Sequence, residues 1–254
     1  MYLGIPSQKS CARAWVAAAT ALIKAGGATF NVVIDVSSPD AHDSTDNEII
    51  TITDRFLKAH DVQPIISVAN TIFPQSLYDG FGSPEFYDVY HRNFDRLAGK
   101  GWGRYFERVT RHQRVDGRTY NPLQSMIDKL RQQNRGRMYS SAYELAVYDS
   151  LRDGRFFRGG QCLSFLSFKV NTEHGLNLTA MYRNHTYIAR CLGNLIGLGR
   201  LQSFVAKEAG LELGSLTCIS THAELDTGKG GKGWGIKDAR RLVGQAAEIV
   251  AASE

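Results

Sequence analysis

The chain has 254 residues, of which 43% are hydrophobic, and a formal net charge of +5 at pH 7. This length suits one large α/β domain or two small ones, and no apolar run approaches the roughly 20 residues that a membrane-spanning helix needs. The four cysteines (11, 162, 191 and 218) have no paired spacing, which excludes a disulfide framework and a zinc site, so we expect a reduced, cytoplasmic setting. The positive charge suits an anionic ligand but selects none.

The N-terminal part of the chain contains four predicted elements. Residues 12–25 are rich in helix formers and end at two glycines, a typical helix stop. Residues 30–36 form a strand candidate, and residues 46–60 have the apolar stripe of an amphipathic helix. The proline-bounded run 64–74 predicts a short buried helix, with a strand as the alternative.

Aromatic and basic residues dominate positions 75–115. Within them, the stretch 102–118 is typical of a nucleic-acid-binding surface, because such surfaces combine cations with stacking rings. The rim of a pocket for a small anion explains the same residues. We favour the pocket rim, and therefore expect no nucleic-acid partner.

The C-terminal half begins with a helix. Residues 122–131 predict an amphipathic helix, which is followed by a basic loop at 132–137 and a strand at 138–143. Near the end of the chain, a glycine-rich segment precedes a predicted helix at 237–252. The sequence contains no internal repeat or linker, so we expect a single domain over residues 1–254.

Two alternating runs predict a β-hairpin around a turn that contains Gly175. The hairpin would place Cys162 and Arg183 at the same end of the sheet. A cation beside a thiol lowers the pKa of the thiol and makes it a nucleophile, so Cys162 is a candidate catalytic residue. Side chains alternate along a strand, so one face of the first run would carry Cys162, Ser164, Leu166, Phe168 and Val170.

Six residues share their order and context with one enzyme family. A cysteine leads a strand, a phenylalanine and a valine follow it along that strand, and an arginine ends the return strand. An asparagine then opens a helix, and a histidine follows the next strand. These positions are filled by Cys162, Phe168, Val170, Arg183, Asn194 and His222. In this pattern the chain resembles the thymidylate synthase family, which includes the pyrimidine nucleotide hydroxymethylases.

The resemblance covers residues 118–226 and is weaker over 60–117, which leaves residues 1–60 and 228–254 as divergent ends. It implies a thymidylate-synthase-like α/β (α+β) fold, in which a large twisted mixed sheet is flanked by helices. It also implies a homodimer, because in this family arginines of the loop before residue 138 reach into the site of the other subunit.

The resemblance gives a nucleophile and a set of phosphate ligands. Cys162 corresponds to the thiolate that adds to C6 of a pyrimidine ring and makes C5 nucleophilic. Arg183 and Arg137 correspond to phosphate-binding arginines, whose planar guanidinium groups match a phosphate. Arg135 is either a further phosphate ligand or part of a solvated basic loop. Asn184 stands where the family has a phosphate-binding serine, and its amide can still donate a hydrogen bond.

The base and the sugar are assigned in the same way. Asn194 corresponds to the asparagine that pairs with O4 and N3–H of uracil, and its other interpretation is a helix N-cap. Because the cytosine hydroxymethylases of the family tend to have an aspartate here, we expect a uracil nucleotide. His222 corresponds to a sugar-contacting histidine. Glu224 replaces the tyrosine that shares this role, so both ribose and deoxyribose stay open.

The folate half of the site departs from the family. Asn70 stands at the position of the acid–base glutamate, and Trp102 at that of a tyrosine that helps to remove the C5 proton, so these two are candidates for catalytic support. Thr186 replaces a folate-contacting aspartate, and residues 240–254 have no match to the segment that closes over folate. An amide cannot exchange protons as a carboxylate does.

From this resemblance we expect one-carbon transfer from 5,10-methylenetetrahydrofolate to C5 of dUMP or UMP through a covalent Cys162 adduct. The protein would then be a thymidylate-synthase-like methyltransferase of nucleotide biosynthesis. A pyrimidine nucleotide 5-hydroxymethylase is the enzymatic alternative, since an altered folate half can admit water in place of hydride. A nucleotide-binding paralogue with altered catalysis is the third interpretation.

Overall fold

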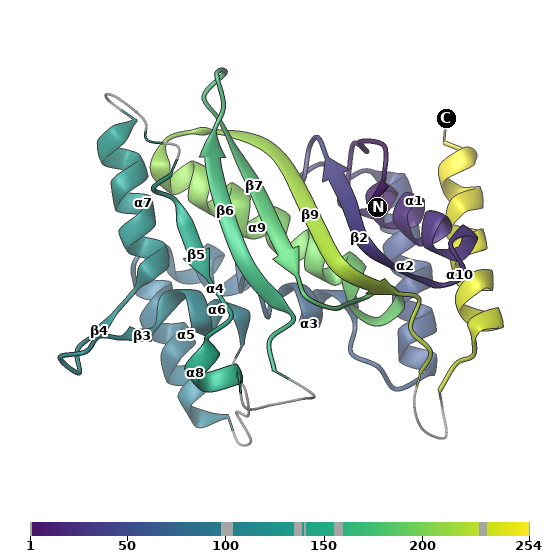
Figure 1. The fold of residues 1–254 in the computed structure, drawn as a ribbon, viewed down its shortest axis with the longest axis horizontal. Coiled ribbons are helices and arrows are strands. Elements are labelled where there is room, and N and C mark those ends of the chain that lie inside the picture. Colours follow the sequence, from purple (N-terminus) through teal and green to yellow (C-terminus); the bar gives the residue numbers. More distant parts are fainter. Residues whose placement is uncertain are drawn as a thin grey trace.

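The computed structural model describes residues 2–97, 104–134, 139, 141–154, 160–228 and 233–253 of the chain. Within these residues, one seven-stranded mixed sheet organises the fold (Figure 1). Its strands follow the order β1 (Leu3–Gly4), β2 (Ala28–Val36), β9 (Glu212–Glu224), β7 (Gly175–Tyr182), β6 (Leu163–Val170) and β5 (Glu144–Ala146). In addition, β8 (His185–Thr186) pairs with β9, and a separate small sheet joins β3 (His112–Gln113) to β4 (Thr119–Tyr120).

Helices cover one face of this sheet (Figure 1). Behind the strands runs α9 (Leu192–Ala209), which continues directly from a π-helical turn, η1 (Tyr187–Cys191). The other helices are α1 (Cys11–Lys24), α2 (Ser44–Ala59), α3 (Ile65–Ala69), α4 (Gln75–Phe81), α5 (Glu85–Arg96), α6 (Tyr105–Thr110), α7 (Pro122–Gln133), α8 (Ser150–Asp153) and α10 (Ile236–Ala251). None of the described helices is both long and apolar enough to cross a membrane.

The predicted mixed α/β architecture, a large sheet flanked by helices, is confirmed. The run 64–74 contains the helix α3 rather than a strand. The predicted strand at 138–143 is wrong, because among the described residues of this range none belongs to the sheet, and β5 begins only at Glu144. The buried Tyr143 is hydrogen-bonded to Gln133 of α7, which anchors this segment to the helix.

The predicted hairpin of β6 and β7 is confirmed, but a bulge interrupts its alternation. Two steps along β6, from Leu163 to Phe165, lie opposite one step along β7, so Ser164 is an extra residue. The carbonyl oxygen of Ser164 accepts hydrogen bonds from the backbone N–H groups of residues 147 and 148. Consequently Leu163 lies on the buried face with Leu166, and the predicted placement of Ser164 on that face is wrong.

A buried amide attaches α9 to the sheet. The Nε2 atom of the fully buried Gln202 lies 2.7 Å from the carbonyl oxygen of Leu176 and 3.0 Å from those of Gly214 and Ser215. These carbonyls lie where the register between β7 and β9 shifts. The amide therefore satisfies backbone groups that the interrupted ladder leaves without a partner.

Glycines bring α9 close to α3. A Cβ atom on Gly193 would lie 2.6 Å from Cβ of Val68, and one on Gly197 would lie 2.8 Å from the carbonyl oxygen of Ala69. Both distances are shorter than side-chain contacts allow, so these two positions require glycine for the helices to pack at this spacing. The packing sets Thr71, just after α3, near the N-terminal part of α9.

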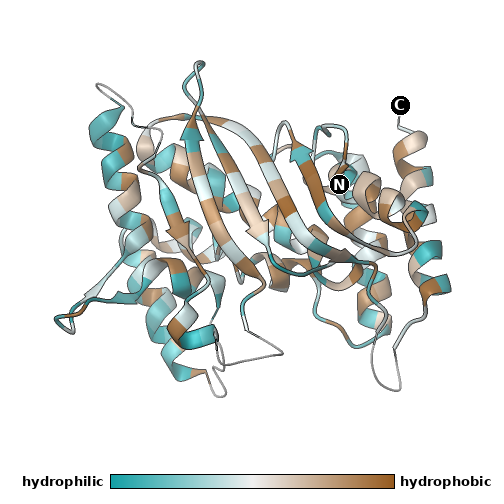
Figure 2. Ribbon diagram, viewed as in Figure 1, coloured by the Kyte–Doolittle hydropathy of each residue, from teal (hydrophilic) through white to brown (hydrophobic). Residues whose placement is uncertain are grey.

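The opposite face of the sheet is covered by no helix in the described part of the chain (Figure 1). Polar and apolar residues alternate along the central strands (Figure 2). Apolar side chains nevertheless form a continuous row, because register partners on four adjacent strands are Phe165, Met181, Ile219 and Val33. These four side chains are partly exposed, and Met181 is 38% exposed. The row gives the uncovered face an apolar band.

Candidate functional site

Cys162 lines a cavity of about 330 Å³ at one end of the sheet. Its walls come from α3 and the start of α6, from the segments that flank the β6–β7 hairpin, and from η1 and α9. The lining residues are Val68, Thr71, Arg104, Tyr105, Gly160, Gln161, Cys162, Asn184, His185, Thr186, Arg190 and Asn194. Cys162, Asn184 and Asn194, which are far apart along the chain, are thus brought together as the sequence predicts.

The hairpin places Cys162 next to Arg183, as predicted. Leu163 and Tyr182 are register partners, and the backbone N–H of Arg183 donates to the carbonyl oxygen of Cys162 over 2.9 Å. The two residues therefore lie at the same end of the sheet, each one step beyond its strand.

The predicted lowering of the Cys162 pKa is wrong for the free protein. Burial raises the pKa of this thiol above its ordinary value, while the cations Arg183 and Arg190 lower it and Glu224 raises it. Burial outweighs the two arginines because it removes water from the thiolate. The cations reduce this effect without reversing it, so Cys162 is mainly a thiol at neutral pH.

Arg183 lies beside the cavity rather than in its lining. Its Nε donates to the carbonyl oxygen of Gln161 over 2.9 Å, and its guanidinium carbon lies 5.8 Å from the ring centre of Tyr148. The predicted phosphate ligands Arg135 and Arg137, and Trp102, lie outside the described residues.

Asn194 lies inside α9, where its side chain is 4% exposed. The N-cap of α9 is Cys191, because η1 extends the helical backbone toward the N-terminus, so the N-cap interpretation of Asn194 is wrong. Its Nδ2 lies 3.0 Å from Nε2 of His185. The side-chain amide is thus oriented within the cavity wall and does not cap the N-terminus of the helix.

His185 is a part of the site that sequence analysis missed. The ring is fully buried and stacks on Tyr182 at 4.1 Å, and its Nδ1 lies 3.0 Å from the hydroxyl oxygen of Ser220. Burial lowers the pKa of His185 to about 3, so the ring is neutral. With Nε2 accepting from Asn194, Nδ1 carries the hydrogen and donates to Ser220. The second N–H and the carbonyl oxygen of Asn194 are then available to a ligand.

Asn184 connects the cavity to His222 and Glu224. Its Oδ1 is hydrogen-bonded to Nδ1 of His222, and its Nδ2 lies 3.5 Å from a carboxylate oxygen of Glu224. His222 and Glu224 do not line the cavity itself. Of these three residues, Asn184 is the one that lines the cavity.

Asn70 lines a second cavity of about 610 Å³ that adjoins the first. Thr71, Arg104 and Arg190 line both cavities. Aromatic rings of α5, Tyr90 and Phe94, contribute to the larger one. Asn70 is therefore near the Cys162 cavity but separated from it by the shared residues.

Tyr105 is a second residue that sequence analysis missed. It lines the Cys162 cavity, and burial raises the pKa of its phenol to about 12, with Cys162 adding to this effect. Hydrogen bonds with backbone groups of Leu163 and Cys162 act in the opposite direction. The phenol thus keeps its proton beside the thiol. Tyr105 lies in the aromatic and basic stretch 102–118, and His185 lies between Arg183 and Asn194. The sequence marks both segments, but only the tertiary fold places these two side chains at the site.

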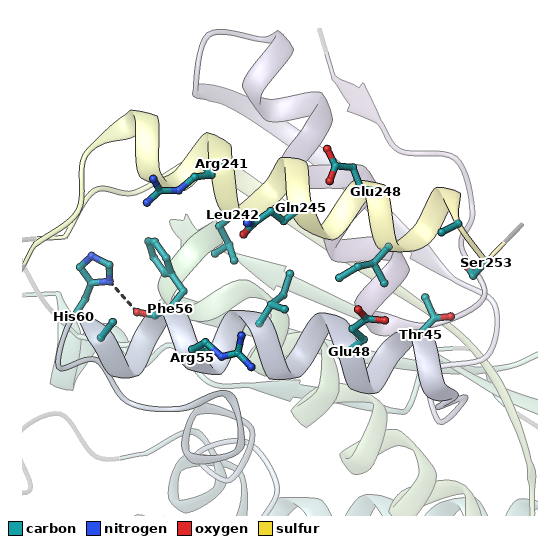
Figure 3. A pocket seen from close by; sticks show the side chains of 14 residues that line it. Thr45, Glu48, Arg55, Phe56, His60, Arg241, Leu242, Gln245, Glu248 and Ser253 are labelled. Atoms are coloured by element: carbon teal, nitrogen blue, oxygen red, sulfur yellow. Dashed lines mark hydrogen bonds between the residues drawn. The ribbon is translucent and has the colours of Figure 1, made fainter.

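A larger cavity, a groove of about 830 Å³, lies between α2 and α10. Figure 3 shows Glu48, Arg55 and Phe56 of α2 opposite Leu242 and other side chains of α10. None of the predicted site residues lies in it. No cluster suited to a metal ion occurs among the described residues.

Comparisons with known proteins do not assign the chain to a family. No protein-family model matches it, and no curated protein matches it significantly.

Proposed function

We propose that this protein transfers a one-carbon unit to C5 of a pyrimidine nucleoside monophosphate. The observation that carries the proposal is that Cys162 and Asn194 line the same cavity. A nucleophile, and an amide able to pair with the edge of a base, are two groups that this chemistry requires.

In the proposed reaction the thiolate of Cys162 forms a bond to C6, and the electron pair of the C5–C6 double bond moves to C5. C5 would then form a bond to the one-carbon unit and give up its proton. The bond between that carbon and the nitrogen of its donor would break, with hydride or water taking its place, and departure of the thiolate would restore the C5–C6 double bond. Covalent addition divides one difficult step into easier ones. Since burial raises the pKa of Cys162, the cations Arg183 and Arg190 are the groups that favour the thiolate.

Asn194 holds the base in this proposal. One of its amide hydrogens is donated to His185, which leaves the other for O4 of uracil and the carbonyl oxygen for N3–H. The buried, neutral His185 acts as a positioning residue, because it fixes the rotation of the amide. Uracil therefore fits better than cytosine, which presents an amino group at C4.

The sugar and phosphate extend toward Asn184 and Arg183. Asn184 is hydrogen-bonded to His222 and Glu224, and a carboxylate accepts hydrogen bonds from sugar hydroxyls. Arg183 is the proposed phosphate ligand of the same chain. We propose that Arg135 and Arg137 of a second subunit complete the phosphate site.

A homodimer through the uncovered sheet face accompanies this proposal. The apolar row of Phe165, Met181, Ile219 and Val33 supports it, since apolar area of this kind is stabilised by burial. Light scattering during size-exclusion chromatography measures the mass. The wild type should elute as a dimer and Ile219→Lys as a monomer, and a monomeric wild type would rule the dimer out.

The proposed one-carbon donor, methylenetetrahydrofolate, supplies the carbon and, for a methyl product, the hydride. The larger cavity fits a planar heterocycle, because Tyr90 and Phe94 line it together with amides such as that of Asn70. Asn70 brings no carboxylate for proton transfer. For this reason a hydroxymethyl product, with water in place of hydride, is the second candidate.

Tritium release from [5-³H]dUMP and [5-³H]UMP, with and without methylenetetrahydrofolate, tests the proposal. The wild type should release tritium, Cys162→Ser should not, and Cys218→Ala serves as a control that removes a buried thiol elsewhere. Nucleotide binding without release would instead indicate the catalytically altered paralogue. Absence of both binding and release would refute the whole proposal.

A further inference from the structure

Two arginines lie where the Cys162 cavity meets the larger cavity. Arg104 immediately precedes α6, and Arg190 lies on η1. Each lines both cavities. Within the described residues, neither guanidinium group takes part in an ion pair, and both side chains are exposed to solvent. Both groups are therefore available to a ligand that enters from solution.

The charged side chains that line these two cavities have one sign. Among the described residues, the linings contain Arg104 and Arg190 and no carboxylate. Two other cavities differ. The α2–α10 groove carries Glu48 and Glu248 beside Arg55 and Arg241, and a cavity of about 360 Å³ near α1 carries three aspartates beside Arg200. Only cations are charged in the described lining at the junction, so an anion is favoured there.

The remainder of the larger cavity has the character of a site for a flat polar molecule. Tyr90 and Phe94 supply aromatic surface, and the side chains of Gln63, Asn70 and Asn93 supply amide donors and acceptors. Small-molecule sites generally combine apolar surface with a few convergent polar groups.

We propose that Arg104 and Arg190 form an anion-binding subsite for a carboxylate or phosphate group of a second reactant, whose remaining part fills the larger cavity. This inference extends the proposed function. It depends on that function in one respect, because it takes the bound anion to belong to a second reactant. A guanidinium group binds such anions through paired, charge-assisted hydrogen bonds, and two of them can enclose one anionic group. The subsite is separate from Arg183, which lines neither cavity.

Isothermal titration of the full chain with tetrahydrofolate, and separately with inorganic pyrophosphate, tests the subsite. The first probe carries carboxylates and the second phosphates, so the pair of titrations separates the two sources of negative charge. We expect the wild type to bind at least one probe, Arg104→Gln and Arg190→Gln each to weaken that binding about tenfold, and the double variant to weaken it further. Arg240→Gln, an exposed arginine of α10, is the control and should bind as the wild type does.

A parallel titration with dUMP separates this inference from the proposed function. Unchanged dUMP affinity in the double variant, with probe binding lost, supports the subsite. An equal loss of dUMP affinity would mean that the pair binds the phosphate of the nucleotide, which overturns the inference and leaves the proposed function intact. The inference is also overturned when the wild type binds neither probe at millimolar concentration, or when the double variant binds both as the wild type does. If dUMP binds nowhere but probe binding still depends on the pair, the subsite stands and the proposed function fails.

Discussion

The groove between α2 and α10 is more than twice as large as the Cys162 cavity, at about 830 Å³ against about 330 Å³. Its walls are the surfaces of two helices, and they carry charges of both signs (Figure 3). The smaller cavity is bounded by residues of several helices and loops. Its described lining holds a thiol, a phenol, an oriented amide and two cations, and no carboxylate.

The difference shows that the fixed orientation of buried polar side chains, rather than the volume of the cavity, distinguishes the Cys162 cavity as a candidate site. Asn194 is fixed by His185, which Ser220 and Tyr182 fix in turn. In the groove, Figure 3 draws one hydrogen bond among the lining residues, between His60, the C-cap of α2, and the backbone of Phe56. The hydrogen bonds of Arg241 with Asp238 and of Ser253 with Arg13 are exposed, whereas those of Asn194 and His185 are buried. Preorganised polar groups are what catalysis and specific binding require.

The strongest test of this comparison measures tritium release by two variants, one with a substitution in the Cys162 cavity and one with a substitution in the groove. Cys162→Ser should reduce tritium release by about 10⁴-fold or more, since removal of a nucleophile eliminates the covalent route. Gln245→Ala, which changes the α2–α10 groove, should leave release within about twofold of the wild type. Equal losses in the two variants would contradict the assignment of the chemistry to the smaller cavity.

The next largest effect concerns the base. Asn194→Asp replaces the amide by a group that accepts hydrogen bonds only, which suits the amino group of cytosine better than the carbonyl group of uracil. We expect turnover of dUMP to fall about 100-fold, and the ratio of dCMP to dUMP turnover to rise. Asn47→Asp on α2 introduces the same charge at an exposed position and should change neither. An unchanged ratio of dCMP to dUMP turnover in Asn194→Asp would show that Asn194 does not recognise the base.

A smaller effect is expected on stability, through His185. His185→Gln should lower the free energy of unfolding by about 2 kcal/mol at pH 7.5, since it removes a buried ring and disturbs its hydrogen bonds. The folded pKa of about 3 lies below the unfolded value of about 6.5, so between these pH values only the unfolded state binds the proton. Wild-type stability should therefore fall by up to about 1.4 kcal/mol for each pH unit below about 6.5.

Urea unfolding at pH 7.5 and 5.5 measures this contribution. His185→Gln should lose less stability between the two pH values than the wild type does. The exposed His42→Gln variant should retain the wild-type difference. If His185→Gln and the wild type lose equal stability on acidification, the ring is not neutral and buried as described.

The smallest expected effect concerns the Cys162 thiol. Arg190→Gln removes a cation that lowers the pKa of this thiol, so the fraction of thiolate at pH 8 should decrease and alkylation by iodoacetamide should slow about threefold. The other three cysteines are buried, so the reaction reports on Cys162. Arg240→Gln provides the control. An unchanged or faster rate in Arg190→Gln would place Arg190 too far away to act on the thiol.

The sequence predicts the parts of the fold whose signals are local. The alternation in β6 and β7 and the turn at Gly175 locate the hairpin, and the hairpin alone places Cys162 beside Arg183. The Ser164 bulge could not be predicted, because its carbonyl oxygen is satisfied by a segment that precedes the hairpin by many residues. The strand at 138–143 was misplaced for a related reason, since the Tyr143 side chain packs against α7.

From the sequence, only the part of the site that lies on the β6–β7 hairpin can be located, namely Cys162 and Arg183. The sequence predicts that Asn194 opens a helix, but η1 adds a helical turn before it, and no propensity rule predicts a π-helical turn. His185 has a role only through Ser220 and Asn194, which come from separate elements. Arg104 and Arg190 likewise meet only in the folded chain.

The close approach of α9 and α3 has a consequence for how the site could change during evolution or in the laboratory. Gly193 and Gly197 set the separation of α9 and α3. Both helices line the Cys162 cavity, and α3 also lines the larger one. A single added methyl group at Gly193 would act as a spacer, because it would collide with Val68 and move α3 outward. The shape of the Cys162 cavity can therefore be adjusted from a glycine that does not line it.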